Sequence, residues 1–424
     1  MKRKVNIVKR KVLILFAAIL LSFAWQAEAQ NYDTNGDYVQ TFAGSGFSGY
    51  VDGVGQQTMF NGPAAIVADS HGNLFVWDNI NIRIREITPS GTVSTFAGGG
   101  SQSTGVGTNA NLNLIYSGLP TSMTIDHNDT IWMVNPNAQY LYTITSGAMV
   151  TYTNLSVARP YGICADSHNN IYISGFGDNK IYRYNTNGVL SVFAGSGNPS
   201  YADGNGIFTA FYNPTALAAD AADDIYVWDW SNSRIRRIDQ SQNVTTFAGQ
   251  YDSNVDGVGT NASFIFIYQM CFDDSGNLYL ACGNGGEGTC IRKIDAATNV
   301  VTLAGSFTQT GYTNGAGNLA RFNGAGGVCI SSGTIFVADS VNERIRSITN
   351  NPTAQVVSAA NLQLNTYPGL QIVGTVGHTY QIQTSPDLNS WSIKATILLN
   401  SSPYLWIDQN PVSGNKFYRA LLLP

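Results

Sequence analysis

The sequence predicts an all-β fold: a six-bladed β-propeller of four-stranded blades, followed by a small C-terminal β-sandwich-like domain. The first observation is a recurring tripeptide, Phe-Ala-Gly, with copies at Phe42, Phe96, Phe193, Phe247 and, as Leu-Ala-Gly, Leu303. Most neighbouring copies are 54 or 56 residues apart, which is typical of repeat architectures. The second is that each interval holds four short strand-like runs, the content of one propeller blade. The third is that the two ends of the repeat region are incomplete in complementary ways.

Residues 63 to 98 illustrate one blade. Apolar runs at 63–68 and 74–78 flank the turn-forming sequence Ser-His-Gly-Asn. Residues 82–87 alternate isoleucine with charged side chains, which indicates a half-buried strand. A second turn leads to a fourth run, at 93–96, which ends in the tripeptide. We therefore expect four antiparallel strands in this interval.

The same pattern recurs in five further copies. The aspartate that ends the first run is Asp69, Asp126, Asp166, Asp220 and Asp273, and becomes Ser331 in the last copy. The basic third strand returns at 234–236, 291–294 and 344–346, and in weaker form at 140–142 and 180–183. The long interval between Phe96 and Phe193 therefore holds two blades, with a degenerate tripeptide near Tyr152.

The ends of the repeat region predict how the ring closes. The last copy, from about residue 324 to 349, supplies three strands and lacks the tripeptide strand. The first tripeptide strand, at 38–44, has no blade before it. Pairing these two segments would let the N-terminal strand complete the sixth blade and leave no open edge.

The repeat also has a family resemblance. The first copy carries the frame Ile-x-x-Asp-x-x-Gly-Asn-Leu-x-Val-x-Asp-x-x-Asn-x-Arg-Ile-Arg at Ile66, Asp69, Gly72, Asn73, Leu74, Val76, Asp78, Asn81, Arg83, Ile84 and Arg85. The last copy repeats its second half at Val337, Asp339, Asn342, Arg344, Ile345 and Arg346. Over roughly residues 38 to 350 the chain thus resembles NHL-repeat propellers of secreted bacterial proteins. The resemblance implies the fold but not the function, because such propellers include both binding modules and enzymes.

Residues 1–29 have the features of a secretory signal peptide. A basic start precedes an apolar run at 12–23 and the small-residue site Ala-Glu-Ala at 27–29. The alternative is an uncleaved anchor, although a bilayer span needs ~20 apolar residues. Cleavage would remove six of 22 Lys+Arg and one of 27 Asp+Glu, leaving 16 and 26 and a net charge of −10. We expect a monomer that is secreted, periplasmic or on the cell surface, with no membrane insertion after cleavage and no nucleic-acid partner.

The five cysteines fall into two groups. Cys282 and Cys290 flank a Gly-rich loop between neighbouring strands of the fifth blade, so a disulfide is expected in an oxidising compartment. Cys164, Cys271 and Cys329 each stand two residues before the repeat aspartate position, where other copies carry small or apolar residues. We expect these three to be buried, unreactive thiols.

The repeat pattern stops after residue 350. Residues 351–361 read as a linker, and residues 362–424 contain a new set of short strands separated by Pro, Gly and Asn turns. We expect a β-sandwich-like module, whose role could be surface attachment, secretion sorting or glycan contact.

Candidate binding residues lie on the face that carries the long connections between blades. Long loops on a rigid scaffold commonly bind ligands, and these are rich in aromatic residues. The repeated Asp and Arg are expected to form structural pairs. The predicted ligand-binding residues are Tyr50, Trp77, Asp78, Tyr201, Trp228, Asp229, Trp230 and Tyr251. Trp230 is the strongest candidate, since it has no counterpart in other repeats. The short connection at 155–159 predicts a notch in the loop wall that opens the central channel.

These residues favour a non-catalytic scaffold for a peptide, protein or polysaccharide. No catalytic residues are predicted, and only four histidines occur, so a His-built zinc site is not expected. One alternative is a metal-dependent hydrolase or lyase of the gluconolactonase-like propeller type, with calcium as its cofactor. The other is a cell-surface adhesion or structural protein. The repeated motif Asp-Gly-x-Gly suggests calcium weakly, and Asx turns explain it better. We therefore predict no metal site and no cofactor.

Overall fold

The computed structural model describes residues 32, 36–112, 122–250, 253–284, 288–350, 369–372, 376–386, 390–399, 404–407 and 417–423. The chain forms two compact units, one up to Gln355 and one from Val356. The predicted signal peptide at 1–29 and the predicted linker at 351–361 lie outside the described residues. Within the described residues, no helix has the length and apolar character needed to cross a membrane.

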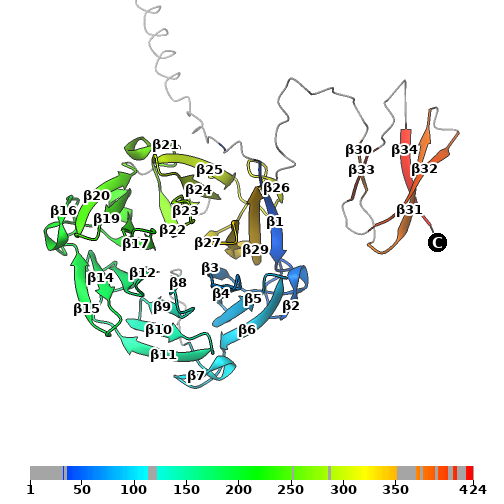
Figure 1. Cartoon of the computed structure of the whole chain (residues 1–424). Coiled ribbons are helices and arrows are strands. Elements are labelled where there is room, and N and C mark those ends of the chain that lie inside the picture. Colours follow the sequence, from blue (N-terminus) through cyan, green and yellow to red (C-terminus); the bar gives the residue numbers. More distant parts are fainter. Residues whose placement is uncertain are drawn as a thin grey trace, which may run out of the picture. The chain divides into compact units, whose positions relative to one another are not determined.

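The first unit is a ring of six antiparallel sheets (Figure 1). Each blade has four main strands, numbered here from the innermost outward. Blade 1 contains β3 (Pro63–Ala68), β4 (Leu74–Asp78), β5 (Arg83–Ile87) and β6 (Thr92–Gly98). Blade 2 contains β8 (Met123–Ile125), β9 (Ile131–Asn135), β10 (Tyr140–Ile144) and β11 (Met149–Asn154). Blade 3 contains β12 (Pro160–Ala165), β13 (Ile171–Gly175), β14 (Lys180–Tyr184) and β15 (Leu190–Ala194).

The second half of the ring follows the same order. Blade 4 contains β17 (Pro214–Ala219), β18 (Ile225–Asp229), β19 (Arg234–Ile238) and β20 (Asn243–Ala248). Blade 5 contains β22 (Phe266–Phe272), β23 (Leu278–Gly283), β24 (Thr289–Ile294) and β25 (Asn299–Gly305). Blade 6 contains β27 (Ala325–Ser331), β28 (Thr334–Asp339), β29 (Arg344–Asn350) and the N-terminal strand β1 (Asp37–Ala43). The predicted all-β, six-bladed fold is therefore confirmed.

Strand β1 closes the ring. It pairs antiparallel with β29, with Tyr38 opposite Thr349 and Gln40 opposite Ser347. The first and last segments of the propeller are therefore hydrogen-bonded neighbours in one sheet, as their complementary ends predicted.

Five of the six blades carry a fifth, two-residue strand that the sequence did not predict. These strands are β2 (Gly53–Val54), β7 (Gly105–Val106), β16 (Gly204–Asn205), β21 (Gly257–Val258) and β26 (Gly315–Ala316). Each lies in the long connection that precedes its blade and pairs with that blade's outermost strand. The connection thus wraps the outer edge and covers backbone groups that an open edge would expose. Blade 3 keeps four strands because the connection before it, residues 155–159, is too short to do this.

Short 3-10 helices accompany these connections. Four follow an edge strand: η1 (Gly55–Gln57), η2 (Gly107–Asn109), η3 (Gly206–Phe208) and η5 (Gly259–Asn261). Two follow the second strand of a blade, η4 (Trp230–Asn232) and η6 (Ser340–Asn342). Gly55, Gly206 and Gly259 open their helices with φ near +54°, a left-handed conformation that glycine adopts without a Cβ clash.

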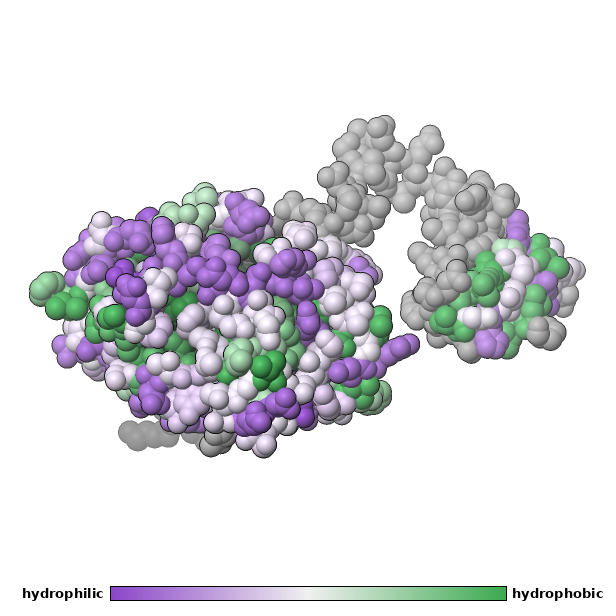
Figure 2. Space-filling view, turned by 60° about the horizontal axis from the view of Figure 1, so that its bottom comes forward, coloured by the Kyte–Doolittle hydropathy of each residue, from purple (hydrophilic) through white to green (hydrophobic). Residues whose placement is uncertain are grey.

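The two faces of the ring differ. The turn face carries the hairpins between first and second strands and between third and fourth strands. There Asp69 accepts hydrogen bonds from the backbone N–H groups of His71 and Asn73, and the same arrangement recurs at Asp166 and Asp273. The loop face carries the connections between blades and the loops between second and third strands. The propeller surface seen in Figure 2 is largely polar, with separate apolar patches.

The core lies between the blades. Six hydrophobic clusters each join two neighbouring blades, such as Trp77 and Ile84 of blade 1 with Met133 and Tyr142 of blade 2. Burial of these apolar faces stabilises the ring at roughly 25 cal/mol per Å² removed from water.

The second unit contains two small sheets. One pairs β30 (Gly369–Ile372) with β33 (Tyr404–Ile407), and the other orders β32 (Ser392–Leu398), β31 (Thr379–Ser385) and β34 (Phe417–Leu422). Short strands are therefore present within residues 362–424, as the sequence predicted.

Candidate functional site

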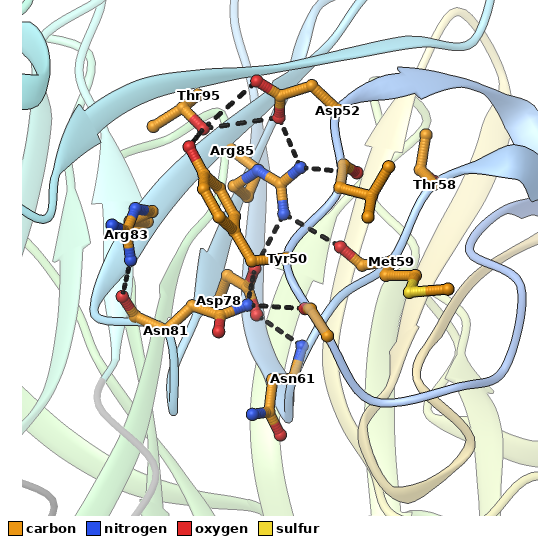
Figure 3. A network of polar contacts seen from close by, with 12 residues as sticks. Tyr50, Asp52, Thr58, Met59, Asn61, Asp78, Asn81, Arg83, Arg85 and Thr95 are labelled. Carbon is orange, nitrogen blue, oxygen red and sulfur yellow. Dashed lines mark hydrogen bonds and ion pairs between the residues drawn. The ribbon is translucent and has the colours of Figure 1, made fainter.

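A buried arginine organises the outer half of blade 1 (Figure 3). The guanidinium of Arg85 donates to the Asp78 carboxylate at 2.9 Å and to the Asp52 carboxylate at 2.5 Å. It also donates to the carbonyl oxygens of Met59 at 3.0 Å and Val51 at 3.1 Å. Asp78 in turn accepts from the Asn61 backbone N–H and the Asn81 side chain. The network fastens the wrapping connection to its blade.

Three other blades repeat this network. Arg236 binds Asp229 and Asp203, and Arg346 binds Asp339 and Asn314. Arg292 binds one carboxylate, that of Asp256, and two backbone carbonyl oxygens. Each arginine is fully buried, and a buried phenylalanine of the connection faces its guanidinium. The first residue of the Asp-Gly-x-Gly motif is therefore an arginine partner. This replaces the predicted Asx turn as its explanation.

Blades 2 and 3 depart from this pattern. Tyr142 and Tyr182 stand at the register position of Arg85. The Tyr182 hydroxyl donates to Asp178 at 2.7 Å, so a hydroxyl–carboxylate hydrogen bond replaces the buried ion pair.

Four predicted ligand-binding residues are buried instead. Trp77, Asp78, Trp228 and Asp229 have no exposed surface. The two tryptophans fill the clusters between blades, and the two aspartates are the arginine partners described above. The prediction that these four residues contact a ligand is therefore wrong, and their roles are structural. At the loop-face end of a second strand, the tryptophan packs between two blades and the aspartate binds the buried arginine.

Tyr50 and Tyr201 lie at equivalent surface positions and share one set of contacts. The Tyr50 hydroxyl is 2.7 Å from that of Thr95, and its ring lies under the guanidinium of Arg83. The Tyr201 hydroxyl is 2.8 Å from that of Thr246, and its ring lies under that of Arg234. Both rings are about half exposed, so they cover the buried arginines and still present a surface to solvent. Tyr251 lies outside the described residues.

Trp230 belongs to a continuous row of rings, here called the aromatic arc: Tyr161, Phe176, Trp230, Phe266 and Tyr268. Successive ring centroids are 6.0, 5.7, 5.1 and 4.7 Å apart. The arc runs across blades 3, 4 and 5 at the loop-face ends of their inner strands. The guanidinium of Arg159 lies 4.7 Å from the Phe176 ring. Among the described residues no carboxylate pairs with Arg159, so the arc combines flat apolar surface with an available cation.

A β-bulge places two members of the arc. The innermost strands of blades 3, 4 and 5 each have a register shift near their start, at Tyr161, Thr215 and Tyr268. Blade 1 has Ala64 at this bulge and blade 6 has Gly326. Bulges often re-aim a side chain next to a functional site. Among the five innermost strands whose bulge the structure describes, blades 3, 4 and 5 thus carry hydroxyl-bearing residues where blades 1 and 6 carry alanine and glycine.

Two hydroxyls beneath the arc are buried without a partner. In the described part of the chain, neither the Tyr161 hydroxyl nor the Thr215 hydroxyl makes a hydrogen bond. Burial raises the pKa of Tyr161, so its hydroxyl stays protonated and can donate. An unsatisfied buried hydroxyl costs roughly 1–3 kcal/mol. Thr215 has no exposed surface and Tyr161 is 5% exposed, so of the two only Tyr161 borders the surface of the arc.

The channel below the arc is narrow and mostly apolar. Residues of all six innermost strands, including Ile66, Ile163 and Met270, line a cavity of about 190 Å³. The Gln269 side chain reaches from blade 5 to blade 1 and donates to the Ile66 carbonyl oxygen at 2.9 Å. The lining side chains are mainly apolar, while backbone groups and Gln269 supply polar surface to the channel.

The predicted notch lies beside the arc. The short connection at 155–159 and the neighbouring segments 177–182 and 196–198 line an open pocket of about 650 Å³. Asp178 and Lys180 are among its polar residues. None of its lining residues belongs to an innermost strand, so the notch is present but does not open the channel.

Two of the five cysteines form a cross-strand pair in blade 5. Cys282 and Cys290 face each other directly across β23 and β24, and all five cysteines are free thiols in the structure. The expected disulfide therefore has the right partners but is not formed here. Within the described ranges, no group of three or more His, Cys, Asp and Glu side chains could hold a metal ion.

Sequence reasoning found Trp230 but missed its neighbours. Phe176 follows β13 as Trp230 follows β18, and Tyr161 and Tyr268 replace the Ala64 position of blade 1. The signal was available in the sequence as a departure from the repeat at these positions.

The fold defines the class of protein as a six-bladed β-propeller. No protein-family model matches the sequence. An auxiliary nutrient binding protein from Bacteroides thetaiotaomicron has a TM-score of 0.57 and 20% identity, covering 74% of this chain and 76% of that one. A second, from Bacteroides ovatus, has a TM-score of 0.56 and 16% identity with the same coverage. At these identities the likeness shows the fold alone.

One curated protein is also similar in sequence. Protein SUPPRESSOR OF QUENCHING 1, chloroplastic, of Arabidopsis thaliana is 26% identical over 325 residues. The match covers 72% of this chain and 27% of that protein. The chain thus spans about a quarter of the length of the curated relative that it matches.

Proposed function

We propose that this protein is a secreted or surface-exposed propeller that binds an extracellular ligand on its loop face without transforming it. The observation that carries the proposal is the aromatic arc, which includes Tyr161 with its unpartnered hydroxyl. Flat rings bury the apolar faces of a ligand, and a few fixed polar groups orient it. A peptide, a protein segment or a polysaccharide offers this combination of groups.

Three further features support this reading. Arg159 adds a cation at one end of the arc, and the notch beside it holds Asp178 and Lys180. The arc is confined to blades 3, 4 and 5 among the described residues. A side chain that departs from the repeat is one that the scaffold itself does not require. Solved propellers of similar fold include proteins named as auxiliary nutrient binding proteins.

The direct test is binding by the full chain to glycan and peptide arrays, followed by titration calorimetry with the best probe. Trp230→Ala should weaken binding by about tenfold or more, because a central ring is lost. Tyr161→Phe removes only the unpartnered hydroxyl, so it should weaken binding while leaving the fold equally or more stable. Tyr172→Phe is the matched control: it breaks the 3.2 Å bond to Asp166 near the turn face and should lower stability while leaving arc binding largely intact.

Two outcomes would contradict the proposal. Binding that survives both Trp230→Ala and Tyr161→Phe would place the ligand elsewhere. Recovery of the bound probe in a chemically altered form would show catalysis instead.

A further inference from the structure

A second departure from the repeat lies on the opposite, turn face, between blades 2 and 3. An open pocket of about 360 Å³ is lined by Asp126, Asn128, Thr130, Trp132, Asn169, Tyr184, Asn185, Thr186 and Gly188. Its volume falls within the ~300–1,000 Å³ typical of small-molecule sites. It lies away from the aromatic arc, since its residues come from the hairpin turns and the arc lies at the loop-face ends of the strands.

Two aromatic rings form the apolar part of this pocket. The centroids of Trp132 and Tyr184 are 6.2 Å apart with the ring planes inclined by 60°. Tyr184 is exceptional, because the corresponding residue in the other five blades is isoleucine: Ile87, Ile144, Ile238, Ile294 and Ile348.

Trp132 is also released from its usual partner. In blades 1, 3 and 4 the aromatic residue at this position packs edge-on against the phenylalanine of the Phe-Ala-Gly strand, as Phe75 does against Phe96. Blade 2 lacks that phenylalanine, and its Tyr152 instead packs against Tyr140 and Tyr142. The Trp132 ring is left partly exposed and facing Tyr184.

The Trp132 ring is held in place from below. Its indole N–H donates to Asp126 at 2.8 Å, and the other carboxylate oxygen accepts from the backbone N–H groups of Asn128 and Thr130. The carboxylate of Asp126 is therefore buried and occupied by three donors. A ring fixed in advance loses little conformational entropy when a ligand packs on it.

The polar rim is neutral where related positions are charged. Asn169 stands at the turn position that carries Asp129 in blade 2 and Asp223 in blade 4. Its side-chain amide oxygen accepts from the His127 backbone N–H at 2.9 Å. The two carboxylates accept in the same way from the backbone N–H groups of Ser70 and Ser167. Asn185 likewise stands where blades 4 and 5 carry Asp239 and Asp295. Within the described residues, the side-chain N–H groups of Asn169 and Asn185 donate to no protein acceptor, so they are available to a ligand.

We propose that this turn-face pocket is a binding site for a neutral sugar ring. The ring would pack its apolar C–H face on Trp132 and Tyr184, and its hydroxyls would accept from the amides of Asn169 and Asn185. Amides in place of carboxylates avoid burying an uncompensated charge beneath an uncharged ligand. The site is independent of the loop-face function, and either can fail without the other.

The test uses the full chain with the methyl glycosides of glucose, galactose and mannose, observed by saturation-transfer NMR and by tryptophan fluorescence. At least one glycoside should bind. Tyr184→Ile introduces the isoleucine that the other five blades carry at this position. Asn169→Asp introduces the aspartate that blades 2 and 4 carry at the equivalent turn position. Each should weaken binding by about tenfold with the melting temperature preserved.

Trp230→Phe on the loop face is the matched control and should leave this binding unchanged. The proposal would be overturned by no saturation transfer to any of the three glycosides, by binding that is unaffected by both pocket variants, or by binding that is lost in Trp230→Phe. Preference for glucuronate over the neutral glycosides would also contradict it.

Discussion

Asp78 and Arg85 form an ion pair at 2.9 Å in which neither side chain has any exposed surface. The pair joins two neighbouring strands of blade 1 and, through Asp52, the connection that wraps the blade's edge. Such a pair need not add stability relative to an apolar core, but losing one partner leaves a buried charge uncompensated.

We therefore predict that Asp78→Ala lowers the free energy of unfolding by about 3–5 kcal/mol. Asp52→Ala removes the second partner of the same arginine, but the Asp52 side chain is 46% exposed. That variant should cost only about 1 kcal/mol, because solvent screens the pair and can replace it. Chemical denaturation of the two variants measures the difference, and equal losses would contradict this account of the network.

A second prediction concerns pH. Burial raises the pKa of Asp229 and of Asp339 to about 6, against the opposing effect of their arginines. The folded state then binds these protons more tightly than the unfolded chain. The stabilising contribution is fully present below the unfolded-state pKa and is lost as pH rises through about 6.

The measurement is the free energy of unfolding of the natural chain and of Asp229→Asn between pH 4 and pH 7. The stability of the natural chain relative to the variant should fall by on the order of 2–3 kcal/mol across this range. Asp295→Asn is the control, since hydrogen bonds from Asn299 lower the pKa of Asp295 and its contribution should instead be lost as pH falls. A relative stability of Asp229→Asn that does not change with pH would refute the shift.

Ring closure gives a third prediction. Val39 of β1 is fully buried between blades 5 and 6, whereas its neighbour Gln40 on the same strand is exposed. Val39→Asp should loosen the N-terminal strand and strongly destabilise the propeller, and Gln40→Asp should have little effect. Hydrogen exchange of β1 and β29 would follow the opening. Equal protection in both variants would mean that β1 is not needed for closure.

The fourth prediction concerns the thiols of blade 5. Cys282 and Cys290 occupy the cross-strand positions where blades 1, 4 and 6 have Asp and Arg, as at Asp78 and Arg83. We predict that protein secreted into an oxidising medium carries the Cys282–Cys290 disulfide, while Cys164 and Cys329 stay reduced. Peptide mapping without reductant tests this, and recovery of both thiols free from oxidised material would contradict it.

The fold was predictable because every blade repeats the same order of apolar, charged and turn-forming residues. Strand β5 alternates buried isoleucine with charged residues, and the incomplete ends at residues 38 and 349 revealed the closing pair. The edge strands were not predictable. Gly53 and Val54 form only two residues of ladder, and they pair because the connection that carries them is held by Asp52 on Arg85.

The site was predictable only in part. Trp230 stands out in the sequence because no other repeat carries tryptophan there, and it lies in the aromatic arc. Trp77 and Trp228 are also tryptophans near the loop face, but they are fully buried in the core. Their positions at the ends of strands do not reveal this burial. Tyr161 and Tyr268 were missed because the β-bulge that turns them toward the arc cannot be read from the sequence, although their side chains depart from the Ala64 position of blade 1.

The central claim is that the aromatic arc binds a ligand on the loop face. Its most direct test is titration calorimetry of the full chain against the strongest array hit, with Trp230→Ala and Trp132→Phe in parallel. We predict that Trp230→Ala weakens this binding by about tenfold or more and that Trp132→Phe leaves it unchanged. Equal affinity for all three proteins would show that the ligand does not occupy the arc.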